Sequence, residues 1–137
     1  MASSAARQRW SANQISKVVV DCAMRVHSAL GPGLLESTYE ACLAHELRKA
    51  GCNVICQLGL PVVYDGVKLD LGYRIDMLVH DLVILEIKAV DAISPVHEAQ
   101  LLSYLKLSGK SLGVLINFNV AHLKDGIRRF VVGKNWE

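Results

Sequence analysis

An aspartate, a glutamate and a lysine lie inside two apolar segments of this chain, and this pattern constrains the fold more than any other. Residues 74–79 and 82–90 are rich in β-branched and aliphatic side chains and are joined by a short His-Asp connection, which predicts an antiparallel hairpin. The first segment contains Asp76, and the second contains Glu86 and Lys88. Because successive side chains of a strand alternate between its faces, Glu86 and Lys88 are predicted to be neighbours.

The length of the hairpin loop decides whether Asp76 joins them. A two-residue turn would put Asp76 and Glu86 on opposite faces, whereas one extra residue would place both carboxylates on one face with Lys88. We therefore predict a three-residue loop or a bulge near residues 80–86. The opposite face would then carry three apolar side chains into the core, namely Met77, Leu85 and Ile87.

Two helices are predicted ahead of the first strand. Apolar residues recur every three or four positions between Ser11 and Leu30, and Ser11 with Gln14 has the pattern of a capping box. A Gly-Pro-Gly sequence ends this helix. A second helix is predicted from about Leu34 to Ala50, where a glycine follows.

The rest of the chain predicts an α/β or α+β fold, in which helices cover a mixed central sheet. Ser94-Pro95 is typical of a helix start, and this helix is expected to run to Ser108. We expect a flexible leader over residues 1–10 and a single domain over residues 11–137. Further strands are predicted at 53–58, 61–64 and 67–71, as a meander leading into the hairpin, at 112–118, buried on both faces, and at 127–132, on an edge.

Composition excludes several classes of protein. The chain has 137 residues, of which 52% are hydrophobic, enough for one sizeable core. A formal net charge of +2 is too small for a protein that coats nucleic acid. No segment resembles a membrane span or a signal peptide, so the expected location is the cytoplasm. The four cysteines form no CxxC pair and are expected to be free thiols.

Two carboxylates on adjacent strands present the hard oxygen ligands that Mg²⁺ prefers. Asp76 and Glu86 could therefore bind the ion, and Lys88 could stabilise charge on a phosphate or orient a water molecule. The alternative is an ordinary ion pair between Glu86 and Lys88 on a solvated surface. The apolar residues on either side favour a buried strand, in which an unpaired charge would be costly.

The helix after the hairpin carries a second polar signal. Gln100 and Tyr104 are four residues apart and therefore share one face of this helix. The alternatives are an exposed polar position for Gln100 and plain packing for Tyr104.

These residues together resemble the active-site signature of the PD-(D/E)XK nuclease superfamily. Asp76 is followed after nine residues by Glu86-Ile-Lys88, and Gln100-Leu-Leu-Ser-Tyr104 is similar to the QxxxY element of its RecB-like branch. The chain departs from the pattern at the proline of the PD element, where Ile75 stands. A further segment, Gly33-Leu-Leu-Glu36-Ser-Thr-Tyr39, resembles the motif of the GxxExxY family within that superfamily, and the similarity extends from about residue 15 to residue 132.

The resemblance implies a restriction-endonuclease-like core and phosphodiester cleavage that depends on Mg²⁺ or Mn²⁺. By position, Asp76 and Glu86 would bind the metal, Lys88 would assist the attacking water, and Gln100 would orient the site or contact nucleic acid. Two acids of the second helix, Glu36 and Glu40, are each candidates for a further catalytic carboxylate. His27 is a candidate metal ligand, and the alternative for it is a partly buried structural histidine. Glu36 could instead simply stabilise the start of its helix.

Contacts with a substrate are less well defined. Lys124, Arg128, Arg129 and Lys134 lie close together in the sequence, and Arg74 lies beside the hairpin, so a phosphate-binding patch that also includes Tyr104 is one interpretation. A solvated basic face is the other. No helix-turn-helix pattern or run of aromatic residues indicates sequence-specific or single-strand binding. A homodimer is one expected arrangement for a domain this small.

Two classes of function are consistent with these residues. The first is a metal-dependent nuclease that acts on DNA or RNA. The second is a nuclease-fold protein that binds nucleic acid or assembles with other proteins, with weak or no catalysis.

Overall fold

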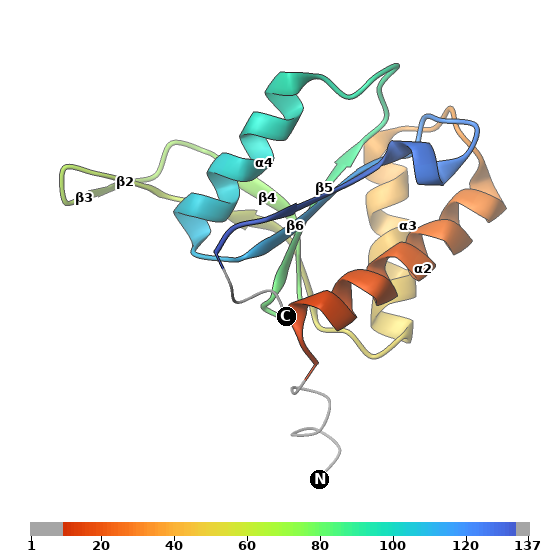
Figure 1. Cartoon of the computed structure of the whole chain (residues 1–137), viewed down its shortest axis with the longest axis horizontal. Helices are drawn as coiled ribbons and strands as arrows, with labels where there is room; N and C mark the ends of the chain where they lie inside the picture. Colours follow the sequence, from red (N-terminus) through yellow and green to blue (C-terminus); the bar gives the residue numbers. More distant parts are fainter. Residues whose placement is uncertain (1–9, 134–137) are drawn as a thin grey trace, which may run out of the picture.

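The computed structural model describes residues 10–133, in which a mixed sheet has helices on both faces (Figure 1). The elements follow in this order: α2 (Ala12–Leu30), α3 (Glu36–Lys49), β1 (Val54–Gly59), β2 (Val62–Tyr64), β3 (Val67–Leu69), β4 (Arg74–Val79), β5 (Val83–Lys88), α4 (Pro95–Ser108), β6 (Leu112–Asn117), the 3₁₀ helix η1 (Leu123–Gly126) and β7 (Ile127–Val131).

The main sheet has five strands in the order β1-β4-β5-β6-β7. Strands β5 and β6 are parallel, and every other neighbouring pair in this sheet is antiparallel. A parallel pair requires a crossover connection, which α4 provides. The sheet is therefore mixed, as the sequence predicts. Strands β4 and β5 of this sheet form the predicted central hairpin.

The two faces of the sheet pack against different helices. Helices α2 and α3 cover one face, where Met77, Leu85 and Ile87 are buried as predicted. Helix α4 covers the other face (Figure 1), where its Leu101 contacts the backbone of β6 at Gly113. A Cβ atom at Gly113 would lie 2.9 Å from the Leu101 side chain, so glycine allows this close approach of helix and strand.

Helix ends are formed by the residues that the sequence indicates. The Ser11 side chain accepts from the Gln14 N–H at 3.1 Å, and the Gln14 side chain accepts from the Ser11 N–H at 2.9 Å, which confirms the predicted capping box. Ser94 makes the same reciprocal arrangement at the start of α4 with His97. The ring of His97 is thus used for capping.

Tyr39 of the GxxExxY-like segment is fully buried and has a structural role. Its hydroxyl donates to the Gly31 carbonyl at 2.6 Å and accepts from the Leu34 N–H at 3.1 Å, so it fixes the turn between α2 and α3. Its ring stacks on Phe118, with 4.5 Å between ring centroids. The Gly-Pro-Gly turn is therefore joined to the core through one side chain.

The predicted meander is wrong. Strand β1 pairs directly with β4, while β2 and β3 form a separate two-stranded sheet that extends beyond α4 (Figure 1). The Asp65-Gly66 turn between β2 and β3 is present, with φ angles of 53° and 74°. Apolar residues of this hairpin are largely exposed, so hydrophobicity alone could not show that it leaves the main sheet.

The remaining predictions concern the edge strand, the cysteines and the termini. Strand β7 lies at an edge, as predicted, and the four cysteines are free thiols, two of them buried. Among the described residues no helix is both long and apolar enough to cross a membrane. The predicted leader falls on residues 1–10, of which 1–9 lie outside the described part of the chain, as does Lys134.

Candidate active site

The β4–β5 hairpin has a three-residue loop, residues 80–82, as one of the two predicted alternatives requires. The register pairs Met77 with Leu85, and Asp76 and Glu86 are the next residues on the two strands. The predicted three-residue loop is therefore confirmed, and the side chains of Asp76 and Glu86 interact. Glu86 alternates with Leu85 and Ile87, which are buried under α2 and α3, so its side chain lies on the face that α4 covers.

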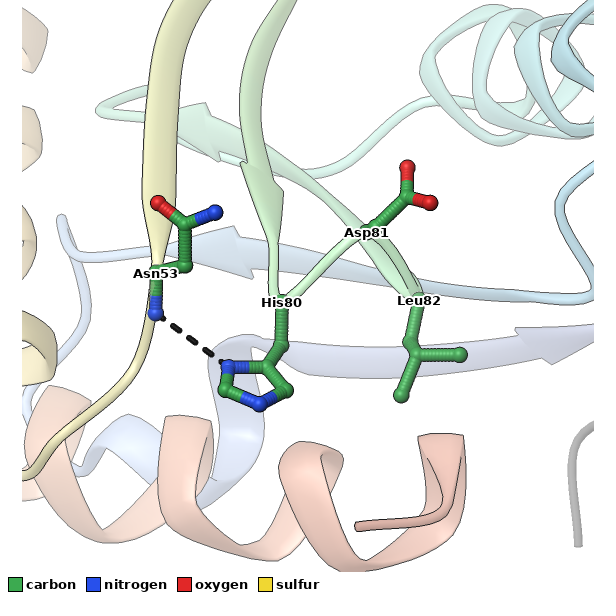
Figure 2. A pocket seen from close by; sticks show the side chains of 4 residues that line it. All are labelled: Asn53, His80, Asp81 and Leu82. Atoms are coloured by element: carbon green, nitrogen blue, oxygen red, sulfur yellow. Dashed lines mark hydrogen bonds between the residues drawn. The ribbon is translucent and has the colours of Figure 1, made fainter. Parts of the chain in front are cut away.

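The loop is held in an unusual backbone conformation. His80 and Asp81 have φ angles of 55° and 57°, in the left-handed region that few side chains favour. The His80 N–H donates to the Asn53 carbonyl at 2.6 Å, and the Asn53 N–H donates to the His80 ring at 3.2 Å (Figure 2). The Asp81 side chain points away from the His80 ring and accepts from Lys110 at 2.9 Å. These contacts stabilise the three-residue loop, whose length sets the register of the hairpin.

Glu86 is a buried carboxylic acid. Its side chain is buried among apolar strands, with 4% of the residue exposed, and its Oε1 atom is the one buried side-chain N or O atom without a hydrogen-bond partner in the described part of the chain. Burial first, and then the hydrogen bond and negative charge of Asp76, raise the pKa of Glu86 to about 9, although the Lys88 ammonium acts to lower it. In the absence of a cation, the acid therefore keeps its proton at neutral pH.

Asp76 is fixed across the hairpin by the backbone of the next strand. Its Oδ2 atom accepts from the Ile87 N–H at 2.8 Å. Asp76 is only partly buried. The two carboxyl groups therefore differ in burial and in hydrogen bonding: Asp76 Oδ2 has a backbone donor, whereas Glu86 Oε1 is buried without a partner.

Lys88 ends β5 and is partly buried near Glu86. The segment that follows it is held by Asn117, a buried residue paired with Lys88 in the parallel register. The Asn117 amide accepts from the Val90 N–H at 3.0 Å and donates to the Val90 carbonyl at 2.9 Å. Asn117 thus fixes the chain just beyond the lysine. Sequence analysis missed it, because the register that pairs Lys88 with Asn117, 29 residues later, was not known.

Helix α4 brings Gln100 and Tyr104 to the carboxylates. Burial first, and then the negative charges of Glu86 and Asp76, raise the pKa of the Tyr104 hydroxyl, while its hydrogen bond with Gln100 lowers it. The predicted shared face of the helix is therefore the face turned toward the hairpin. Tyr104 also contacts the ring of Tyr73 edge-on, with 6.2 Å between centroids.

Helix α3 brings one of the two candidate glutamates to the site. Glu40 is partly buried, and its Oε1 atom accepts from the Gln57 side chain at 2.8 Å; the same Gln57 nitrogen lies 3.4 Å from Asp76 Oδ1. Burial and the charge of Asp76 raise the pKa of Glu40. Glu36 is exposed in the first turn of α3. Of the two, Glu40 therefore lies closer to the carboxylate pair.

Gln57 is a second site residue that sequence analysis missed. It lies on β1, opposite Asp76, with φ of 54°. The sequence carries a weak signal, a polar residue between Cys56 and Leu58 in an apolar strand, but only the pairing of β1 with β4 shows what it faces.

A family model of the PD-(D/E)XK nuclease superfamily matches residues 13–130. The chain belongs to this superfamily. Neither the curated proteins nor the solved structures that were searched contain a match. The matched region spans α2 to β7, and so includes all of the site residues described above.

Enzymes of the PD-(D/E)XK superfamily generally use divalent metal ions, and the carboxylate pair fits such an ion in part. Glu86 Oε1 is buried without a partner next to Asp76, and both supply hard oxygen ligands. Against this, the described residues contain no group of three or more His, Cys, Asp or Glu side chains arranged around one ion. A metal held here would therefore rest on two carboxylates, with water or substrate oxygens completing its shell.

In the structure, the contacts of His27 are made with residues other than the Asp76–Glu86 pair. Its Nε2 atom lies 2.8 Å from the Val120 carbonyl, and its ring faces Phe118, with 6.4 Å between centroids. It lines a separate cavity with His122 and Lys124. The contacts of His27 are thus made with the segment after β6.

Among the basic residues that the structure describes, Arg128 and Arg129 do not share one face. Arg128 and Arg129 pair with neighbouring residues of β6 and therefore point to opposite faces of the sheet. Arg129 donates to Asn13 of α2 at 2.7 Å, while Arg128 donates to nearby backbone carbonyls. Lys124 is exposed on η1, and Arg74, at the start of β4, is the arginine nearest in sequence to the carboxylates.

Proposed function

We propose that this protein is a metal-dependent nuclease that hydrolyses phosphodiester bonds of nucleic acid, with DNA as the first substrate to test. The observation that carries the proposal is the buried, unpartnered Glu86 Oε1 beside Asp76 and Lys88. A protein that used this strand only for structure would gain stability from an apolar residue there. Membership of a nuclease superfamily supports the same function.

Asp76 and Glu86 would hold Mg²⁺ or Mn²⁺, which supplies positive charge to polarise a phosphate and to acidify a water molecule. Glu86 would release its proton when the cation binds, because the cation replaces the missing partner of Oε1. The Lys88 ammonium would donate to a phosphate oxygen or orient the attacking water. Gln100 would hold the Tyr104 hydroxyl toward the carboxylates, and Glu40 is the candidate for a further acid on the α3 side.

We also propose that the chain is a GxxExxY-type member of the superfamily, on the strength of Gly33, Glu36 and Tyr39. Gly33 has φ of 102°, a conformation that disfavours other residues, and Tyr39 fixes the turn through two hydrogen bonds. Gly33 and Tyr39 therefore stabilise the α2–α3 turn, and Glu36 is the first residue of α3.

The test is cleavage of linear, nicked and single-stranded DNA and of RNA with Mg²⁺ or Mn²⁺. We expect the wild-type protein to cleave at least one of these, and Asp76→Ala and Lys88→Ala to lose at least 100-fold in rate, about the size of an electrostatic stabilisation term. Glu98→Gln, on the first turn of α4, is the matched charge control. Cleavage that is absent, or that persists in both variants, would refute the proposal and favour a module that binds nucleic acid without cutting it.

A further inference from the structure

Gln57 has a left-handed backbone conformation within strand β1. Its φ of 54° lies in the left-handed region, which costs a side-chain-bearing residue free energy and, outside turns, often accompanies a functional site. The pairing of β1 with β4 joins Cys56 to Met77 and Leu58 to Ile75 but skips the position between them. The local strain therefore coincides with the point where Gln57 faces Asp76.

Strands β1 and β4 exchange the faces that they turn toward the two helix layers at this position. Cys56 and Met77 pack with the α2–α3 layer, whereas Leu58 and Ile75, two residues further along each strand, pack with the α4 layer. Residues two apart on a regular strand share a face, so both strands change face between these pairs. The left-handed conformation of Gln57 is the backbone feature that accompanies this change.

The Gln57 amide is placed between two acids from different elements. Its Nε2 atom lies 2.8 Å from Glu40 Oε1 on α3 and 3.4 Å from Asp76 Oδ1 on β4. Both neighbours are hydrogen-bond acceptors, so the nitrogen rather than the oxygen of the amide must face them. This hydrogen bond also lowers the pKa of Glu40, against the burial and the Asp76 charge that raise it.

We propose that Gln57 is a positioning residue, which holds Glu40 beside Asp76 and separates their charges, and whose left-handed backbone is retained because it aims the amide between them. The proposal rests on the proposed nuclease function. Without the amide, Glu40 would be repelled by Asp76 and would turn toward solvent, and the carboxylates would no longer be set for a metal.

The experiment compares Gln57→Gly with Gln57→Ala, both of which remove the amide. Only alanine retains a Cβ at positive φ, so Gln57→Gly should have the higher melting temperature, by roughly 2–8 °C. Both variants should lose about 10- to 100-fold in kcat, the loss expected for a hydrogen bond to a charged group, with KM for the nucleic acid near its wild-type value. Both should bind Mn²⁺ several-fold more weakly in calorimetry.

Asp65→Gly is the matched control. Asp65 also has a positive φ, 53°, but lies in the exposed turn between β2 and β3, so its replacement should leave kcat and Mn²⁺ affinity unchanged. If kcat follows the melting temperature, so that Gln57→Gly is active and Gln57→Ala is not, the role is structural and the proposal is wrong. Tighter Mn²⁺ binding in both variants would also overturn it, since Gln57 would then obstruct a metal site.

The two proposals fail in different ways. If the wild-type protein shows no cleavage that depends on Asp76 and Lys88, the nuclease function fails. The Mn²⁺ affinities of the Gln57 variants then decide the positioning role by themselves, because weaker binding supports it and equal or tighter binding refutes it.

Discussion

Replacing Glu86 by glutamine should make the metal-free protein less sensitive to pH. Glu86 has a pKa of about 9 in the folded state, against an ordinary value of 4.5 that it would regain on unfolding. Between these values the folded state holds a proton that the unfolded state releases. Stability contributed by this group is therefore complete below pH 4.5, falls as the pH rises, and is fully lost above about pH 9.

The magnitude follows from the free energy of one pKa unit. Each pH unit in this window should lower the free energy of unfolding by up to about 1.4 kcal/mol, so from pH 6 to pH 8 the loss is at most about 3 kcal/mol. Asp76, Lys88 and Tyr104 interact with Glu86, and a proton shared with Asp76 would leave the sign unchanged. Glutamine has a similar shape and no charge, so Glu86→Gln should lack this slope.

Urea unfolding in EDTA at pH 6, 7 and 8 measures the effect directly. Wild type should lose up to about 3 kcal/mol more than Glu86→Gln over this range. Glu36→Gln, which changes an exposed glutamate of α3, should follow the wild type. Parallel pH dependences for wild type and Glu86→Gln would show that Glu86 is already ionised in the fold, and the argument from burial would fail. Adding Mn²⁺ at pH 8 should stabilise the wild type more than Glu86→Gln.

Three further predictions concern the scaffold of the site. Gly113→Ala should cost about 1–3 kcal/mol in urea unfolding, because its Cβ would lie 2.9 Å from the Leu101 side chain; an unchanged midpoint would mean that α4 shifts freely. Tyr39→Phe keeps the stacked ring and removes both hydroxyl hydrogen bonds, so it should cost about 1–3 kcal/mol, whereas Tyr64→Phe, at an exposed position, should cost almost nothing. Asn117→Ala should lower both stability, by about 2 kcal/mol, and the rate of DNA cleavage, since the segment after Lys88 loses its anchor; full activity would show that this segment needs no support.

Much of the fold and part of the site follow from local pattern. The helix limits were predicted within two residues because capping side chains, glycines and apolar spacing act over one or two turns. The three-residue hairpin loop was also predicted, because a strand has only two faces and an odd loop is needed for Asp76 and Glu86 to share one. The predicted meander was wrong because strand pairing joins distant segments, and the residues of β2 and β3 are as apolar in sequence as those of a strand of the main sheet.

The sequence by itself determined that Glu86 and Lys88 share one face of a strand, and it reduced the position of Asp76 to the length of one hairpin loop. Only the tertiary structure decided which groups approach them from outside the hairpin. Glu40 rather than Glu36 is directed to the site by the packing of α3, and Gln57 and Asn117 reach it through strand registers. Periodicity describes which way a side chain points within its own element, whereas long-range packing sets what it meets there.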